Sequence, residues 1–378
     1  MQQHVLEVEP TFPPPARSFA SDNAAGAHPA VIEAIAAAND GHQLAYGEDA
    51  HTARCEAAFA ELFDADVVTR LAFNGTGANI AGLATMLGSL PGPNHAVVCS
   101  SWAHINTDET AAPERVLSTK LMAVDSRDAK VTPAQLRQAA SAHGNVHHAQ
   151  PGILSITQPT ELGTLYTVEE VRRVCDAAHE LGMLVHLDGA RIANATAALG
   201  GTRGTLRSFT TEAGVDAMSF GGTKNGLVGA DAVVFLNRQV ATGSDYVRKQ
   251  VTQLPSKMRF LAAQFNALLA DDLWIQLGDA ANASAQLLHR GVQSLPGVDA
   301  GPSPAVNSIY PVLPEAAIEP LQRWSFFWDW DEPRHQVRWM TSWDTTPDDI
   351  EQFTAGVASV SGYRTSARSS GPWGRPNR

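Results

Sequence analysis

The sequence has few of the features that mark secreted, metal-binding or membrane-spanning proteins. Its 378 residues contain only three cysteines, Cys55, Cys99 and Cys175. This odd number without C-x-x-C spacing disfavours a disulfide framework and a cysteine-based zinc site, so we expect no metal and a reducing, cytoplasmic compartment. No apolar run approaches the ~20 residues that a membrane-spanning helix needs. The N-terminal segment also lacks the basic start and apolar core of a signal peptide.

Positive charge is also scarce, because 27 Lys and Arg residues stand against 39 Asp and Glu residues, for a net charge of −12. This balance disfavours binding to a nucleic-acid backbone or an anionic membrane. No H-E-x-x-H, G-x-S-x-G or G-x-x-x-x-G-K-[ST] motif occurs. A zinc protease, a serine hydrolase of the usual elbow type and a P-loop enzyme therefore have no support, and chemistry on a small molecule is favoured.

The composition predicts a folded protein with two unstructured ends. Hydrophobic residues make up 44% and charged residues 17% of the chain, as in ordinary globular proteins. Residues 1–17, with four prolines, are expected to form a flexible N-terminal extension. Residues 364–378, rich in Ser, Gly, Pro and Arg, are expected to form a disordered tail.

Short apolar runs alternate with helical patterns along most of the chain. The runs occupy residues 67–73, 96–99, 153–157, 183–187, 217–220 and 232–236. Runs that are apolar on both faces and separated by helices predict a mostly parallel sheet. Clear helix signals stand between them, such as the start at Pro29 and the T-x-x-E capping box of Thr167 and Glu170 with Gly182 as the stop.

The C-terminal third shows a different pattern. From about Phe260 the alternation gives way to a long helical stretch, followed by strands expected at 308–313 and 336–342 and a helix from Pro347. The sequence therefore predicts an α/β fold. A large domain is expected over residues 18–262 and a smaller C-terminal α+β domain over residues 263–363.

The loops after the apolar runs hold the candidate functional residues, because chemistry in an open parallel sheet lies at the carboxyl ends of the strands. Residues 74–79, Asn-Gly-Thr-Gly-Ala-Asn, form a glycine-rich turn before a helix, which suits a phosphate group. The dinucleotide pattern G-x-G-x-x-G fails because Ile80 occupies its third glycine position. A single phosphate is favoured over a nucleotide, and a purely structural turn fits as well.

Two further loops hold charged candidates: an aspartate and an arginine in the first loop, and a lysine in the second. Asp188 and Arg191 follow one run, where they either pair with each other or hold a protonated ring nitrogen and a substrate carboxylate. Lys224 lies in a glycine-rich loop after the next run. Burial there would lower the pKa of the amine and favour Schiff-base formation, whereas a lone lysine in such a loop is more often solvated. The order of phosphate loop, Asp and Lys favours the functional interpretation.

His104 follows the run at 96–99, with Glu109 five residues later. An imidazole at a strand end can stack on an aromatic cofactor or move protons near neutral pH. Most of the 13 histidines have no such placement. His104 is therefore the candidate acid or base.

Taken together, these segments resemble the pyridoxal-phosphate enzymes of the aspartate aminotransferase fold, fold type I. Among these, the chain is similar to the low-specificity L-threonine aldolase branch of the β-eliminating lyases. The matching segments, in family order, are SDN at 21–23, YGED at 46–49, NGTGAN at 74–79, AHI at 103–105, HLDGAR at 186–191, SFGGTKNG at 219–226, KMR at 257–259 and RWMT at 338–341. The resemblance covers residues 18–362.

The resemblance implies a cofactor, pyridoxal 5'-phosphate, and a role for each matching residue. Lys224 would hold the cofactor as a Schiff base, Asp188 would pair with its pyridine nitrogen, and His104 would stack on its ring. The remaining cofactor contacts would come from Gly75, Thr76, Gly77, Arg191, Thr223 and Arg259.

The resemblance also implies how substrate and subunits are arranged. Ser21, Arg191 and Arg338 would bind the substrate carboxylate. Arg259 would reach the phosphate site of a neighbouring subunit, so active sites would be shared across a dimer within a homotetramer built as a dimer of dimers.

Two segments depart from the family pattern. The usual T-H-x-D near the last arginine is Thr341-Ser342-Trp343-Asp344 in this chain. Where threonine aldolases carry N-T-H, this chain has Gln158-Pro159-Thr160-Glu161, so Thr160 replaces a histidine near the substrate hydroxyl. A threonine hydroxyl exchanges hydrogen bonds but is no base at neutral pH. Proton removal would then fall to His104, to an ordered water or to the cofactor phosphate.

Three functions are compatible with the sequence. The first is a lyase that cleaves a β-hydroxy-α-amino acid to glycine and an aldehyde. The second keeps the cofactor and performs β-elimination or transamination on another amino acid, since the same carbanion chemistry serves both. The third, a non-catalytic protein with this fold, is disfavoured by the presence of Lys224 and Asp188 together.

Overall fold

The computed structural model describes residues 9–92 and 94–361. A seven-stranded sheet forms its centre, with the strand order β1-β7-β6-β5-β4-β2-β3. The strands are β1 (Val68–Ala72), β2 (His95–Ser100), β3 (Lys120–Val124), β4 (Gln150–Thr157), β5 (Leu184–Gly189), β6 (Ala217–Gly221) and β7 (Asp231–Phe235). Strands β2 to β6 are parallel, and β7 is antiparallel to both of its neighbours. The predicted mostly parallel sheet is confirmed; β3, an edge strand in which only Leu121 is buried, was not predicted.

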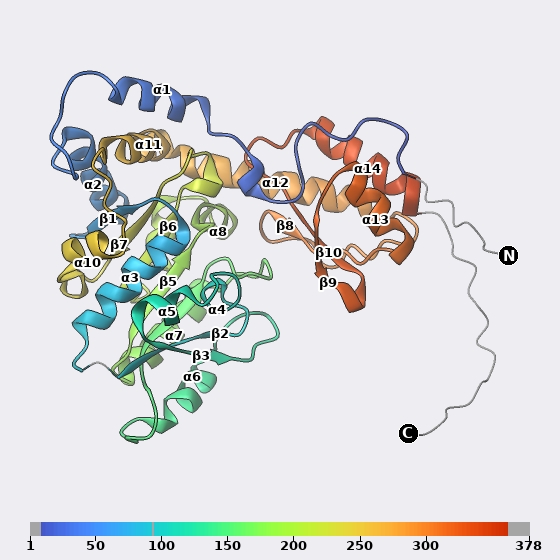
Figure 1. Cartoon of the computed structure of the whole chain (residues 1–378). Helices are drawn as coiled ribbons and strands as arrows, with labels where there is room; N and C mark the ends of the chain where they lie inside the picture. Colours follow the sequence, from blue (N-terminus) through green and yellow to red (C-terminus); the bar gives the residue numbers. More distant parts are fainter. Residues whose placement is uncertain (1–8, 93, 362–378) are drawn as a thin grey trace, which may run out of the picture.

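Helices cover both faces of this sheet (Figure 1). They are α1 (Pro29–Ala38), α2 (Ala50–Phe63), α3 (Gly75–Ser89), α4 (His104–Thr107), α5 (Ala112–Leu117), α6 (Pro133–Ala139), α7 (Val168–Glu180), α8 (Ile192–Leu199), α9 (Arg203–Ser208), α10 (Ser244–Gln250) and α11 (Arg259–Leu269). Among the described residues, no helix has the length and apolar character needed to cross a membrane.

Two hydrophobic cores lie on opposite faces of the sheet. Because successive strand residues point to opposite faces, Ile153 packs into the core under α3 while its neighbour Leu154 packs into the core that contains α2, α7 and α11. The three cysteines are buried and unpaired in these cores. The central strands are continuous apolar runs in the sequence because a hydrophobic core covers each of their two faces.

The predicted helix boundaries agree closely with the structure. Helix α1 begins at Pro29, and α7 has the expected capping box, in which the Thr167 hydroxyl accepts from the Glu170 N–H. Helix α2 begins at Ala50, because the Asp49 carboxylate accepts from the Thr52 N–H at 2.8 Å and caps the helix.

A smaller domain follows at the C-terminal side. It holds the three-stranded sheet β8-β10-β9, formed by β8 (Ser308–Ile309), β9 (Trp328–Asp331) and β10 (Gln336–Met340). Helices α13 (Glu315–Trp324) and α14 (Pro347–Ser361) pack beside it (Figure 1). The strand expected at 308–313 is shorter than predicted, whereas the strand at 336–342 and the helix from Pro347 are confirmed.

The boundary between the domains lies beyond the predicted position after residue 262. That position falls inside α11, whose Leu261 and Phe265 belong to the core of the large domain. Helix α12 (Leu273–Val292) then runs from one domain to the other (Figure 1). Its first turns pack into the large core through Trp274, and its last turns pack into the small core through Leu288. Helix α12 therefore contributes side chains to the hydrophobic cores of both domains.

The predicted flexible extension is wrong for residues 9–17. The Arg17 guanidinium lies 3.3 Å from Asp349 of α14, and the Trp324 indole N–H donates to the Phe12 carbonyl at 2.7 Å. This segment packs on the small domain before the chain crosses to α1 (Figure 1). Residues 1–8 and the predicted disordered tail, 364–378, lie outside the described residues.

Candidate active site

A cavity of about 230 Å³ opens at the carboxyl ends of the central strands. The loops after β1, β2, β4, β5 and β6 contribute to its wall, as the parallel sheet predicts. The cavity is lined by Asn23, Asn74, Gly75, Thr76, Asn79, His104, Glu109, Thr157, Pro159, Thr160, Glu161, Asp188, Ala190, Arg191, Thr223, Lys224 and Asp231. The structure thus brings together most residues that the sequence singled out.

The glycine-rich turn forms the N-terminus of α3. The Asn74 side chain caps this helix by accepting from the Gly77 N–H at 2.7 Å. The backbone of Gly75 and Thr76 lies in the cavity wall, and a Cβ added at Gly75 would meet no atom within 4 Å. Gly77 does not line the cavity; a Cβ there would lie 2.5 Å from the Gln253 side chain, so this glycine serves close packing. The helix N-terminus and the open space beside it suit an anion.

Asp188 lies at the end of β5 and is almost fully buried. Its Oδ2 accepts from the Asn79 amide at 2.9 Å, and its Oδ1 accepts from the Ala190 N–H at 3.0 Å and from the Ser219 hydroxyl at 3.3 Å. Burial alone would raise the pKa of Asp188, but the charges of nearby histidines and these hydrogen bonds hold it below its usual value. The cavity therefore contains a fixed negative charge.

Lys224 lies in the short 3-10 helix Thr223–Asn225, directly after β6. Its amine makes no hydrogen bond or ion pair with the described residues. Burial and the nearby Arg191 charge hold the pKa of Lys224 below the usual lysine value, against the opposing charges of Asp22 and Asp188. The loop itself is fixed, because the Thr223 hydroxyl donates to Asp231 at 2.8 Å. Lys224 is thus carried on a fixed loop, and its amine is more nucleophilic than that of an ordinary lysine.

His104 begins α4, and its ring is linked to Asp188 through other side chains. Its Nδ1 lies 3.0 Å from the Glu109 Oε1, which also accepts from the Asn79 amide at 3.0 Å. The hydrogen bond with Glu109 raises the pKa of His104, against the effect of burial. The protonated imidazole is therefore favoured more than in a free histidine.

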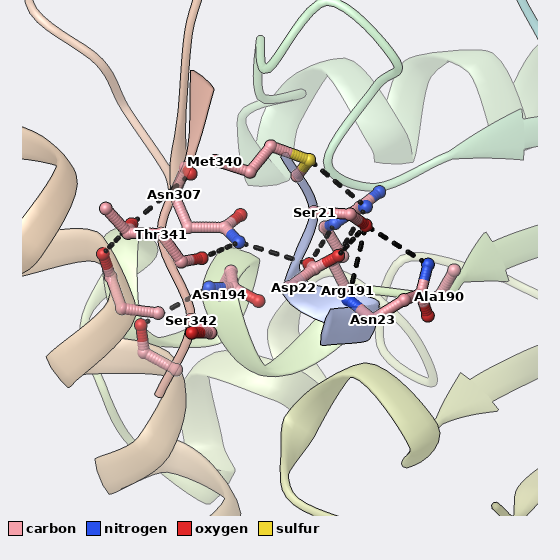
Figure 2. A network of polar contacts seen from close by, with 12 residues as sticks. Ser21, Asp22, Asn23, Ala190, Arg191, Asn194, Asn307, Met340, Thr341 and Ser342 are labelled. Atoms are coloured by element: carbon pink, nitrogen blue, oxygen red, sulfur yellow. Dashed lines mark hydrogen bonds and ion pairs between the residues drawn. The ribbon is translucent and has the colours of Figure 1, made fainter. Parts of the chain in front are cut away.

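Arg191 pairs with Asp22 rather than with Asp188. Its Nε and Nη2 donate to the two Asp22 oxygens at 2.6 and 2.9 Å, and Asn307 of the small domain donates to the same carboxylate at 3.1 Å (Figure 2). The predicted internal pair of Asp188 and Arg191 does not form. Asp22 instead joins the N-terminal segment, the large domain and the small domain at the cavity edge, and leaves Nη1 of Arg191 without a hydrogen-bond partner among the described residues.

Thr160 and Glu161 form the wall beyond β4. The Thr160 hydroxyl lies 2.7 Å from the Thr164 hydroxyl and accepts from the Thr164 N–H at 3.2 Å, so it closes a turn of its own loop. Glu161 lines the same cavity, and its Oε1 accepts from the His104 N–H at 2.8 Å. The predicted contact between Thr160 and a substrate hydroxyl stays a prediction.

Comparison with known proteins assigns this arrangement to a family. The model of the β-eliminating lyase family matches residues 18–312. The chain belongs to this family. The lyase is 40% identical to the low specificity L-threonine aldolase of Pseudomonas aeruginosa, over 92% of this chain and 98% of that protein. It is 29% identical to the low specificity L-threonine aldolase of Saccharomyces cerevisiae over 52% of this chain and 49% of that protein.

Solved structures agree with this assignment. The threonine aldolase of Leishmania major matches the lyase with a TM-score of 0.83 and 27% identity, covering 91% of this chain and 99% of that one. Mouse CSAD matches with a TM-score of 0.67 at 12% identity, covering 91% and 83%, which shows a shared fold alone. The predicted fold type I architecture and the family resemblance are confirmed.

Besides Gly77, three residues predicted for the site lie outside the cavity wall of the lyase. Ser21 caps the turn that presents Asp22 and Asn23, and its hydroxyl accepts from the Asn23 N–H at 3.2 Å. Arg338 of β10 stacks 5.4 Å above the Trp330 ring, and its buried Nε makes no hydrogen bond to any residue that the structure describes. Arg259 donates to the Gly41 carbonyl at 3.4 Å, away from this chain's own cavity. Their roles toward substrate, and toward the phosphate site of a neighbouring subunit, stay predictions.

Several residues of the lyase's cavity were not predicted as site residues. Asn23, Asn79, Asp231 and Glu161 all lie in its wall. Asn79 and Glu161 belong to segments that the sequence had singled out, and both are polar residues just beyond an apolar run. Their importance depends on contacts with distant segments, which no local pattern reveals.

Proposed function

We propose that this protein is a pyridoxal-phosphate-dependent carbon-carbon lyase that cleaves β-hydroxy-α-amino acids of the threonine type to glycine and an aldehyde. Relatives and a solved structure that cover nearly the whole chain carry the name threonine aldolase. The observation that carries the proposal is that Lys224, an amine of lowered pKa, and Asp188, a buried carboxylate, line one cavity. Within fold type I, this pair is the minimum that such chemistry needs.

The cavity residues fit pyridoxal phosphate. The N–H groups of Gly75 and Thr76 lie at a helix N-terminus beside open space, which suits the phosphate. Asp188 would hold a proton on the ring nitrogen, and Lys224 would bind the aldehyde carbon. When bound, the cofactor supplies an electron sink for the breaking Cα–Cβ bond.

The chain's own residues would then position the substrate. Arg191, fixed by Asp22 through Nε and Nη2, would present Nη1 to a substrate carboxylate, and Arg338 of the small domain would supply a second guanidinium. A carboxylate held in this way fixes the orientation of the Cα–Cβ bond. Orientation of this kind can lower a barrier by roughly 7–11 kcal/mol in favourable systems.

Arg338→Ala is expected to raise KM by roughly 10- to 100-fold and to change kcat less, because a guanidinium contact with the carboxylate is made in both ground and transition states. Arg338→Lys should restore little, since lysine lacks the planar pair of donors. Steady-state kinetics on several β-hydroxy amino acids measures this. A KM that stays constant for all of them would contradict the assigned role.

An aldehyde-release screen of threonine, allo-threonine, serine and phenylserine with the purified protein tests the proposed function. We expect aldehyde from at least one of the substituted β-hydroxy amino acids. Release of pyruvate or another 2-oxo acid with ammonia, and no aldehyde, would favour the second candidate, β-elimination.

We also propose that the protein is a homo-oligomer, a dimer of dimers, with active sites at the dimer interface. In support, Leu44, Tyr46 and Tyr246 expose 68%, 47% and 77% of their surface, and Arg259 lies on the Gly41 loop away from its own cavity. Exposed apolar side chains are commonly covered by a second copy. Light scattering should give about four times the 40.2 kDa of one chain; a monomeric mass would contradict the proposal.

A further inference from the structure

Glu161 is held in the cavity wall by contacts from separate parts of the chain. Its Oε1 accepts hydrogen bonds from the His104 backbone N–H at 2.8 Å and from the Thr157 hydroxyl at 3.0 Å. Its backbone carbonyl accepts from the Tyr310 hydroxyl of the small domain at 2.7 Å. These contacts fix the carboxyl group in the same cavity as Lys224.

The second carboxyl oxygen of Glu161 has no partner. Oε2 is buried and makes no hydrogen bond to any described residue. An unpaired buried acceptor is costly, and nearly all such atoms in proteins are paired. A hydroxyl group on a bound molecule would supply the missing donor.

The surroundings of Glu161 raise its pKa so that the carboxyl group titrates near neutral pH. Burial, reinforced by the Asp188 carboxylate, raises the pKa of Glu161 to about 7, against the hydrogen bonds from backbone N–H groups and Thr157. Cys99, Tyr166 and Tyr310 also interact with it, and since the pKa of each is raised by burial they stay neutral there. A carboxyl group that titrates near the working pH is an effective acceptor and donor of protons.

The other candidate proton acceptors in the cavity are already engaged. The hydrogen bond that the His104 ring donates to Glu109 raises the pKa of His104 and favours the protonated imidazole, which cannot accept a further proton. Glu109 Oε2 also has no hydrogen-bond partner among the described residues. Both oxygens of Asp188 accept hydrogen bonds, and both oxygens of Asp231 are taken by Gly222 and Thr223.

We propose that Glu161 takes the proton of the substrate β-hydroxyl group through Oε2. This inference rests on the proposed function. The proton moves from the β-oxygen to Oε2, the O–H electron pair forms the aldehyde C=O bond, and the Cα–Cβ bond breaks with its electron pair kept by the amino-acid fragment. A proton then adds to Cα to give glycine, and Glu161 releases its own proton, so no oxidation or reduction occurs.

Glu161→Gln separates proton transfer from structure, because the amide keeps an Oε1 acceptor for His104 and Thr157. We expect kcat on threonine-type substrates to fall by roughly 10²- to 10⁴-fold, the usual loss for a general base. Glycine has no β-hydroxyl, so its binding, followed by visible absorption, and the exchange of its α-proton in D2O should be unchanged. Glu169→Gln, on the exposed side of α7 where it pairs with arginines, is the matched control and should match wild type.

The pH dependence supplies a second readout. Wild-type kcat should rise as pH increases through about 7, where Glu161 loses its proton, and this limb should be absent in Glu161→Gln. The raised pKa also means that the folded chain loses stability as pH increases from the unfolded value, about 4.3, to about 7. The melting temperature of Glu161→Gln relative to wild type should therefore be higher at pH 8 than at pH 5.

Turnover equal to wild type in Glu161→Gln, or an equal loss of glycine α-proton exchange, would overturn the inference. If this variant does not fold, Glu161→Asp tests the same point, since it should lose turnover but keep the pH limb; a lost limb would contradict the assignment. A wild-type protein that releases no aldehyde would instead overturn the proposed function, and the inference with it.

Discussion

Lys224→Ala is expected to reduce turnover of β-hydroxy amino acids by at least about 10³-fold, the scale of losing a covalent nucleophile. The Lys224 amine is the one that the cavity holds with a lowered pKa and without a partner among the described residues. Wild-type protein should be yellow and should carry a stable label on Lys224 after borohydride reduction. Steady-state rates and peptide mapping measure both effects.

Lys120→Ala is the matched control for this experiment. Lys120 is exposed at the start of β3 and does not line the cavity. Its replacement should leave colour, label and turnover as in wild type. A borohydride label on any lysine other than Lys224 would show that the cofactor is bound elsewhere.

Asp188→Asn is expected to reduce turnover by at least about 10²-fold while cofactor stays bound. The amide fills the same space, but it cannot stabilise a protonated ring nitrogen as the carboxylate does. The asparagine NH2 group would also replace one carboxylate oxygen and would face the N–H donor of either Asn79 or Ala190. Rates must be compared at equal cofactor occupancy, measured by absorption.

Asp279→Asn, an exposed residue of α12, is the control and should be indistinguishable from wild type. Because the pKa of Asp188 lies below its usual value, the defect of Asp188→Asn should persist across neutral and alkaline pH. Full turnover of the variant at full occupancy would mean that Asp188 only supports the loop that follows β5.

The sequence predicted the core strands of the large domain because both of their faces are buried, and such runs stand out in composition. It did not predict β3, whose edge position leaves residues such as Lys120 in solvent. Nor did it predict that residues 9–17 would pack on the small domain, since their contacts, such as that of Arg17 with Asp349, join positions more than 300 residues apart.

The candidate site, like the fold, could be predicted from the sequence only in part. Asp188 and Lys224 could be predicted because strand ends in a parallel sheet converge, so chain order alone brings them together. The pairing of Arg191 with Asp22 and the placement of Glu161 against His104 could not, because each depends on a contact between loops of distant segments. The proposal that Glu161, rather than His104, accepts the substrate proton therefore depends on three-dimensional contacts.

The central claim is tested most directly by measuring the products formed from one substrate. Purified protein supplied with pyridoxal phosphate and threonine should release glycine and acetaldehyde in equal amounts, with no ammonia. Release of ammonia with 2-oxobutanoate in place of glycine would contradict the proposed cleavage of the Cα–Cβ bond and assign the same cavity to elimination.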